Sequence, residues 1–90
     1  MEYNINPKLI YMMKYIAFVG KEDEDPNHHL AKVYNICDTF GPAWLPKEFV
    51  LLKLFRWSLK DKAFTWLQSL PNNSITSWMD CIREFTQKNL

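Results

Sequence analysis

The sequence predicts an all-α protein, a compact bundle of about five short helices. Two observations carry this prediction. Apolar residues recur with helical spacing between the five prolines, whereas no alternating strand pattern extends beyond a few residues. The chain has 90 residues, of which 48% are hydrophobic and 23% are charged, which is typical of a single globular domain. We therefore interpret residues 1–90 as one domain.

Proline marks the start of the first two helices. Asn6-Pro7 has the form of an N-cap followed by proline in the first turn, and we expect this helix to end near Gly20. Asp25-Pro26 repeats the signal after the acidic run at residues 22–25, which we interpret as a solvated loop and a helix cap. Gly41-Pro42 is expected to end the second helix. Its predicted apolar face consists of Leu30, Val33, Tyr34, Cys37 and Phe40.

Three further helices complete the prediction. Pro46 begins the third, which is apolar on nearly all sides and is therefore expected to be central. The fourth is expected over residues 58–70. The fifth is expected to begin near residues 74–77, where Ser77 with Asp80 three residues later resembles a capping box. The residues expected to hold the core are Leu30, Val33, Phe55, Leu59, Trp66, Leu67, Trp78, Ile82 and Phe85.

The titratable and nucleophilic residues do not form a catalytic pattern. His28 and His29 are adjacent at the start of the second helix, where we expect them to be partly exposed and to point about 100° apart. Cys37 and Cys81 stand 44 residues apart without a CxxC motif, which predicts reduced, buried thiols and a cytoplasmic protein. Zinc sites normally show paired ligands at short spacing, and none is present. The sequence therefore predicts no enzyme: no catalytic residue, no metal and no cofactor.

The charge balance bears on possible partners. Eleven basic and ten acidic residues give a net charge of +1, which does not favour nucleic acid as a partner of this segment alone. The longest apolar stretch, residues 9–20, is shorter than the roughly 20 residues that cross a bilayer, so no membrane partner is expected. Trp57 lies within one local basic cluster and could be a core residue or a stacking platform. That cluster is either a solvated face or a weak RNA contact, formed by Lys53, Arg56, Lys60 and Lys62.

Several short motifs follow one another in an order that is found in a known family. Residues 20–30 read G-K-E-D-E-D-P-N-H-H-L and residues 36–40 read I-C-D-T-F. Residues 60–67 read K-D-K-A-F-T-W-L and residues 70–78 read L-P-N-N-S-I-T-S-W. These motifs resemble those of the Gag capsid domain of plant Ty3/gypsy-type LTR retrotransposons. The resemblance extends over residues 6–88, although Arg56-Trp57 stands where that family has Pro-Phe.

The resemblance implies a fold and two functions. The implied fold is that of the N-terminal lobe of a retroviral capsid. The implied function of this transposable-element protein is self-association with other Gag copies, as a homo-oligomer, toward a virus-like particle shell that needs no active site. The alternative is a domesticated or relic Gag lobe that binds short peptides of host proteins in a hydrophobic groove. Exposed aromatic residues, Trp44 or Trp57, would indicate such a groove.

Overall fold

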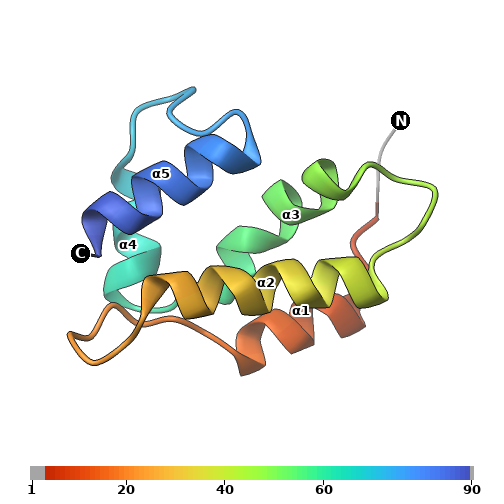
Figure 1. Ribbon diagram of the computed structural model, residues 1–90, viewed down its shortest axis with the longest axis horizontal. Coiled ribbons are helices and arrows are strands. Elements are labelled where there is room, and N and C mark those ends of the chain that lie inside the picture. The colour runs from red at the N-terminus through yellow and green to blue at the C-terminus, as the bar shows by residue number, and fades with distance from the viewer. Residues whose placement is uncertain (1–3, 90) are drawn as a thin grey trace.

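The protein has an all-α fold, as the sequence predicted (Figure 1). The computed structural model describes residues 4–89, so the two ends of the expected domain at 1–90 lie outside the described residues. Within 4–89, five α-helices and one short 3-10 helix follow one another along the chain. They are α1 (Pro7–Tyr15), α2 (Pro26–Phe40), α3 (Lys47–Phe55), η1 (Arg56–Ser58), α4 (Lys62–Ser69) and α5 (Trp78–Lys88).

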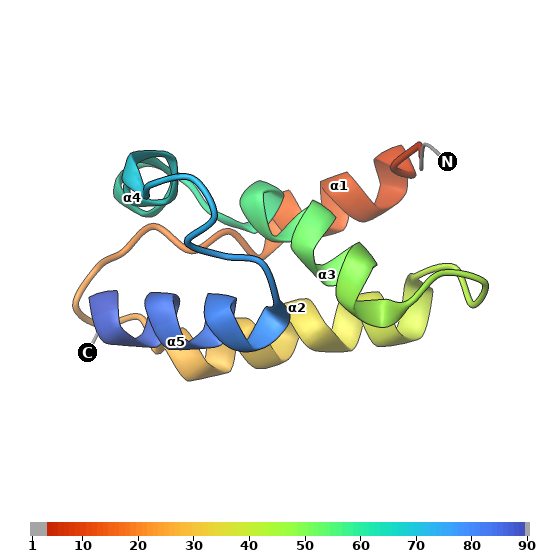
Figure 2. The ribbon, with the colours of Figure 1, turned by 90° about the horizontal axis from the view of Figure 1, so that it is seen from above.

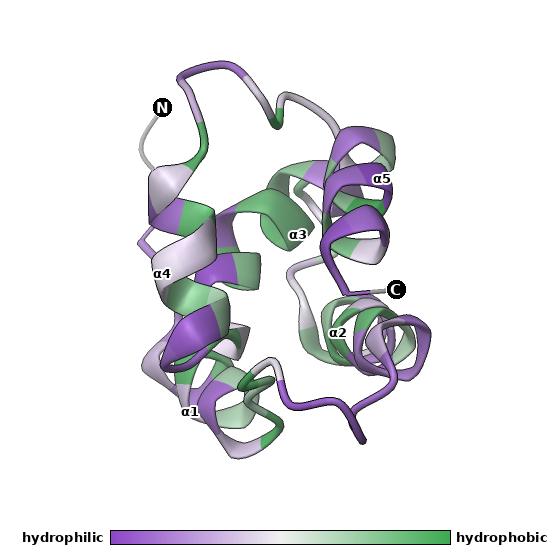
Figure 3. Ribbon diagram, turned by 90° about the vertical axis from the view of Figure 1, so that its left-hand side faces the viewer, coloured by the Kyte–Doolittle hydropathy of each residue, from purple (hydrophilic) through white to green (hydrophobic). Residues whose placement is uncertain are grey.

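The helices form two layers with α3 between them (Figure 2). One layer contains α1 and α4, and the other contains α2 and α5. The central position of α3 follows from its sequence, because an apolar helix must bury most of its faces. Figure 3 shows α3 as a largely hydrophobic segment among helices of mixed hydropathy. Its buried residues are Val50, Leu51, Leu54 and Phe55.

Side-chain caps start three of the helices where the sequence predicted them. The Asn6 side chain accepts a hydrogen bond from the backbone N–H of Lys8 at 2.9 Å, and proline follows each of the first two caps. Asp25 caps α2 in the same way, with the N–H of Asn27 at 2.9 Å. Ser77 Oγ accepts from the N–H of Asp80 at 3.1 Å and so caps α5. Each cap satisfies a backbone donor that a helix N-terminus would otherwise leave without a partner.

The helix α1 ends at Tyr15, earlier than the expected Gly20, because the following residues pair with a distant segment. The N–H of Phe18 donates to the carbonyl oxygen of Ser58 at 2.8 Å. The N–H of Lys60 donates back to the carbonyl oxygen of Phe18 at 2.9 Å, which makes a single parallel bridge. The fourth helix was expected to begin at residue 58, but α4 begins at Lys62 because of the same bridge. Backbone groups at 58–60 bond to α1's exit segment and leave the helical path.

The acidic run is only partly a solvated loop. Asp25 caps α2, but the Glu24 carboxylate turns back and accepts hydrogen bonds from three backbone N–H groups, those of Val19, Gly20 and Lys21, at 2.7–3.2 Å. Burial alone would raise the pKa of Glu24, but these three donors outweigh it and lower that pKa below 4.5. The chain between α1 and α2 is therefore held by an internal carboxylate.

Gly41 ends α2 for a steric reason. Its N–H donates to the carbonyl oxygen of Cys37 at 2.9 Å. A Cβ atom built at Gly41 would lie 2.4 Å from that oxygen, closer than real Cβ contacts. Only glycine fits this turn, which gives a physical reason for the expected Gly41-Pro42 stop.

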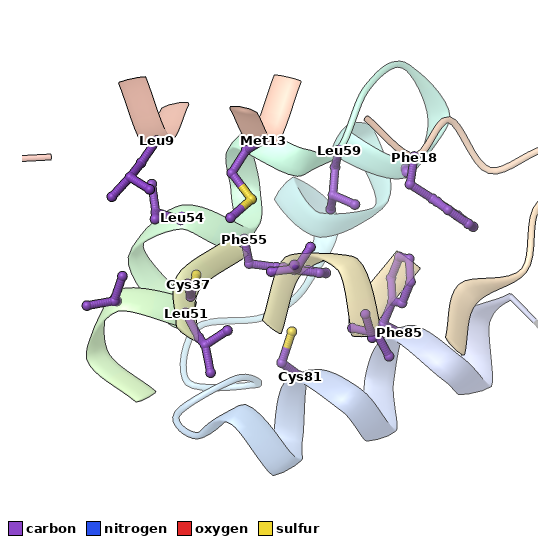
Figure 4. Packing of buried hydrophobic residues seen from close by; sticks show 14 residues of the cluster. Leu9, Met13, Phe18, Cys37, Leu51, Leu54, Phe55, Leu59, Cys81 and Phe85 are labelled. Carbon is purple, nitrogen blue, oxygen red and sulfur yellow. The ribbon is translucent and has the colours of Figure 1, made fainter. Parts of the chain in front are cut away.

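Phe85 belongs to the hydrophobic core, whose buried side chains are drawn in Figure 4. This side chain is fully buried, and its ring centroid lies 4.8 Å from that of Phe18 and 5.4 Å from that of Phe55 in edge-to-face geometry. Such aromatic pairs add about 0.5–1.5 kcal/mol beyond their buried area. Of the residues expected to hold the core, five are buried: Leu30, Val33, Phe55, Leu59 and Phe85. The other four are half-buried and pack against the cluster: Trp66, Leu67, Trp78 and Ile82.

The predicted apolar face of α2 is shorter than expected. Leu30, Val33 and Cys37 are buried, but Tyr34 and Phe40 are 41% and 55% exposed. Tyr34 lies at the edge of the packed face, where the Lys47 ammonium donates to its hydroxyl at 3.1 Å. Phe40 is the last residue of the helix. Both aromatic side chains therefore belong to the surface.

Candidate functional site

A cleft of about 460 Å³ lies between α1, η1 and the start of α4. The parallel bridge between Phe18 and Leu59 builds it, because this bridge holds the end of α1 beside η1. Clefts of about 300–1,000 Å³ are typical of ligand sites. The lining residues are Lys14, Ala17, Arg56, Trp57, Leu59, Lys60, Asp61 and Phe64.

Aromatic rings hold two of the cations that line this cleft. Lys14 Nζ lies 5.4 Å from the centroid of the Trp57 ring. Arg56 Cζ lies 5.5 Å from the same ring and 6.0 Å from that of Phe64. These distances allow cation–π attraction, which is worth about 0.5–1 kcal/mol at exposed sites. The rings therefore help to position the ammonium and guanidinium groups at the cleft.

The cations of the cleft have no carboxylate partner among residues 4–89. Lys14, Arg56 and Lys60 form no ion pair within 4.0 Å. Ion pairs are made by other cations, Lys47 on α3 and Arg83 on α5. Three unpaired positive charges therefore meet at one concave site, which makes it attractive to an anion.

Trp57 lies between the core and the cleft. The side chain is half-buried, packs against the core and also lines the cleft. Its indole Nε1–H is buried and has no acceptor among the described residues. Leaving such a donor unsatisfied costs about 1–3 kcal/mol. Trp57 is therefore not a core residue whose polar group is fully hydrogen-bonded.

Asp61, at the rim of the cleft, has an unusual backbone conformation. Its φ is 53° and its ψ is −122°. The N–H of Ala63 donates to the carbonyl oxygen of Lys60 at 3.2 Å, so Asp61 is the first central residue of a tight turn. Glycine is the usual residue with positive φ at this position. An aspartate there stores about 1–3 kcal/mol of strain.

The structure divides the basic cluster that the sequence singled out. Arg56 and Lys60 line the cleft. Lys53 lies elsewhere, with its Nζ 5.5 Å from the ring centroid of Phe49. Lys62 lines a separate hollow beside α4 and the end of α5. Lys14 was not predicted as a site residue, and its only signal in the sequence is a charge that interrupts the apolar stretch of the first helix.

His29 is buried, which corrects the expectation of a partly exposed side chain. It is 2% exposed, because residue 29 falls on the inward face of α2 one turn before Val33. His29 Nε2 lies 3.0 Å from Ser58 Oγ, and that hydroxyl donates to the carbonyl oxygen of Phe55 at 2.6 Å. His29 Nε2 and Ser58 Oγ therefore form a buried hydrogen-bonded pair. Because both side chains are buried, we assign this pair a structural role.

The environment of His29 favours the neutral imidazole. Burial is the main cause that lowers its pKa from 6.5 to about 4, and the charge of Lys32 acts in the same direction. The Glu24 carboxylate opposes this effect. Aromatic rings complete the surroundings, with the Phe18 centroid at 5.2 Å and the Phe85 centroid at 5.7 Å. The imidazole is thus a neutral part of the core at pH 7.

The two cysteines are free and buried, as the sequence predicted. Burial raises the pKa of Cys37 to about 11 and that of Cys81 to about 12. Both thiols therefore stay protonated and unreactive at neutral pH. Across residues 4–89 no group of three or more His, Cys, Asp or Glu side chains is arranged to hold a metal ion. In the same stretch of chain, no helix has the length and apolar character needed to cross a membrane.

Large apolar side chains lie on the outer surface of three helices and one loop. Tyr11 and Tyr15, one turn apart on α1, are 72% and 83% exposed. Of the two tryptophans expected at a peptide groove, Trp44 in the loop before α3 is 62% exposed, whereas Trp57 is half-buried. Among residues 4–89, the exposed large apolar residues are Tyr11, Tyr15, Tyr34, Phe40, Trp44 and Met79.

A second groove of about 380 Å³ lies between α3, α4 and α5. Its walls are mainly hydrophobic side chains from these helices and from the loop before α5. The residues that line it are Leu52, Phe55, Arg56, Phe64, Leu67, Gln68, Ile75 and Cys81.

Comparison with known proteins gave no match: no family model, no curated protein and no solved structure is significantly similar to this chain. Function is therefore inferred from the residues, their order in the sequence and their arrangement in space.

Proposed function

We propose that this protein is a structural, non-enzymatic domain of the Gag capsid type that associates with further copies of itself in the cytoplasm. The observation that carries the proposal is the set of large aromatic and methionine side chains on its outer surface. The order of motifs over residues 6–88 supports the same assignment. An all-α bundle is also the architecture that such a domain requires.

The exposed side chains are of the type that forms protein interfaces. Aromatic residues and methionine are enriched in interfaces relative to the rest of a protein surface. Tyr11 and Tyr15 lie on the same face of α1, where two phenol rings together present a broad apolar area. A net charge of +1 gives little repulsion between copies. Weak contacts of this kind, repeated by symmetry, can build a shell.

Light scattering coupled to size exclusion tests this proposal. The purified chain is measured from micromolar to millimolar concentration at low and high salt, and the most concentrated sample is examined by electron microscopy. We expect reversible growth with concentration into uniform particles. Growth should persist at high salt, because apolar contacts are not screened. A monomer at every concentration would contradict the proposal.

Two double variants of α1 examine the contribution of its tyrosines. Tyr11→Gln with Tyr15→Gln removes both rings from an exposed helix face and should reduce association. The matched control, Tyr11→Phe with Tyr15→Phe, keeps the rings and should associate like the parent. Met79→Gln on α5 provides a separate test of the other layer. If neither the Tyr11→Gln, Tyr15→Gln variant nor Met79→Gln changes the growth curve, then Tyr11, Tyr15 and Met79 are not the contacts.

A second candidate function is the binding of a short host peptide, and the apolar groove between α3, α4 and α5 favours it. A peptide could place apolar side chains against Leu52 and Leu67, which line the groove. Selection from a displayed peptide library tests this function. Selected peptides should lose binding to Leu67→Arg and keep binding to Lys53→Gln, whose side chain lies outside the groove. Selected peptides that bind both variants equally would exclude this groove.

A further inference from the structure

We propose that the cleft between α1, η1 and α4 binds single-stranded nucleic acid, with one base against Trp57 or Phe64 and the adjacent phosphates on Lys14, Arg56 and Lys60. This inference goes beyond self-association and does not depend on it. It rests on the combination of unpaired cations with aromatic rings in one concave site.

The electrostatics of the cleft favour an anionic ligand. Lys14 comes from α1, whereas Arg56 and Lys60 come from η1 and the segment after it. The three cations have no carboxylate partner within ion-pair distance among residues 4–89, and Asp61 is the only acidic residue in the lining. The whole-chain charge of +1 conceals this local excess, because it is the sum over all eleven basic and ten acidic residues. Phosphate oxygens are suitable acceptors for these donors.

The aromatic residues favour a nucleotide over an anion without a ring system. Trp57 and Phe64 are half-buried and both line the cleft. Stacking of a base on such a ring is worth about 1–3 kcal/mol per base and tolerates any sequence. Among residues 4–89 the buried indole N–H of Trp57 finds no acceptor, so a hydrogen bond from this group to a ligand oxygen would remove the cost of burying it unpaired.

A single strand fits this cleft better than a duplex or an acidic peptide. In a duplex the bases are stacked on one another and cannot reach rings inside a cleft. An acidic peptide would use the cations but would leave Trp57 and Phe64 without a specific partner. The favoured ligand is therefore an unpaired strand whose phosphates follow the cations while one base enters the cleft.

The structure provides matched controls for a binding experiment. Fluorescence anisotropy of a labelled oligouridine of eight nucleotides is measured with the full chain at 50 mM and 200 mM salt. Lys14→Gln, Arg56→Gln and Lys60→Gln each remove one cation from the cleft. Lys53→Gln and Lys62→Gln remove the same charge nearby in sequence but outside the cleft. We expect the first three to weaken binding and the two controls to bind like the parent.

The salt dependence gives the expected size of the effect. Each phosphate contact with a single strand contributes about 0.7 to the slope of log Kd against log salt. With three contacts, Kd should rise about 18-fold between 50 and 200 mM salt. With one cation removed, the rise should fall to about 7-fold. This change in slope distinguishes a lost phosphate contact from a general weakening of binding.

Ring variants test the stacking part. Phe64→Leu keeps an apolar side chain at a half-buried position but removes the ring, and should weaken binding about 5-fold or more. Trp57→Phe keeps a ring and should retain most of the affinity. Thermal melting of each variant shows whether it is folded, and only variants that melt like the parent are compared.

Three outcomes would overturn the proposal. The first is no oligouridine binding by the parent at 50 mM salt. The second is an equal loss for Lys53→Gln, Lys62→Gln and the cleft variants, which would indicate diffuse attraction. The third is displacement of oligouridine by polyglutamate through the same residues at equal affinity, which would indicate an acidic-peptide site. Light scattering of Lys14→Gln provides the separate readout, because self-association through Tyr11 and Tyr15 should survive in this variant.

Discussion

Protonation of His29 should destabilise the fold as the pH falls from 7 to 5. The pKa of this imidazole is lowered from 6.5 to about 4 in the folded protein, chiefly by burial among Phe18, Phe55 and Phe85. In the unfolded chain, His29 takes up a proton below pH 6.5, whereas in the folded chain it stays neutral until about pH 4. Stability is therefore complete above pH 6.5 and is lost as the pH falls toward 4.

The magnitude follows from these two pKa values. Between pH 7 and pH 5, the free energy of unfolding should fall by about 2 kcal/mol, and the full loss below pH 4 should be about 3 kcal/mol. The total stability of a chain of this size is about 5–13 kcal/mol, so the change is readily measured. Glu24 and Asp80 also have lowered pKa values, but they lose their contributions below about pH 4.5. The interval from pH 7 to pH 5 therefore reports mainly on His29.

Urea unfolding followed by tryptophan fluorescence measures this effect at several pH values. His29→Gln replaces the imidazole with a neutral side chain that can still form a hydrogen bond with Ser58 Oγ. Its stability should be nearly independent of pH between 7 and 5. The control His28→Gln changes an exposed histidine in the same helix turn and should keep the pH dependence of the parent.

Two results would refute this reasoning. If the parent is equally stable at pH 7 and pH 5, His29 is not protected from protonation by the fold. If His29→Gln loses as much stability as the parent, the pH dependence comes from other groups.

Further predictions concern packing, backbone strain and capping. Phe85→Ala should lower the free energy of unfolding by about 3–5 kcal/mol in urea titration, and half-buried Trp66→Ala should cost less; the reverse order would contradict the placement of the core. Asp61→Gly should raise the melting temperature and add about 1 kcal/mol, because release of strain exceeds the entropy cost of glycine; Asp61→Asn, which keeps the strain, should not. Ser77→Ala should cost about 1 kcal/mol through the lost cap of α5, measured by chemical denaturation; no loss would show that the cap is not needed.

The parts of the fold that depend on local signals could be predicted from the sequence. Asn6-Pro7, Asp25-Pro26 and Ser77 begin helices at the expected residues, because an N-cap acts only on the next turn of the chain. Gly41 ended α2 for a similarly local reason. These signals were sufficient for the all-α class and for most of the helix order.

The parts that depend on distant contacts could not be predicted. The C-terminal end of α1 and the start of α4 are set by the bridge between Phe18 and Leu59. Helical periodicity contains no information about such pairing. The burial of His29 depends on Ser58, 29 residues away. Of the three cations in the cleft, the sequence predicted Arg56 and Lys60 but not Lys14, because Lys14 lies on a separate helix.

The bridge between Phe18 and Leu59 also marks the place where α1 can separate from the rest of the fold. The N–H groups of Phe18 and Lys60 bond across the junction between the exit of α1 and the segment around η1. They can exchange with solvent deuterium only when these two segments part. Their exchange rates would therefore give the free energy of undocking α1, separately from that of the Phe85 core. If these amides exchange faster than those of α2 and α5, α1 opens on its own, and the cleft opens and closes with it.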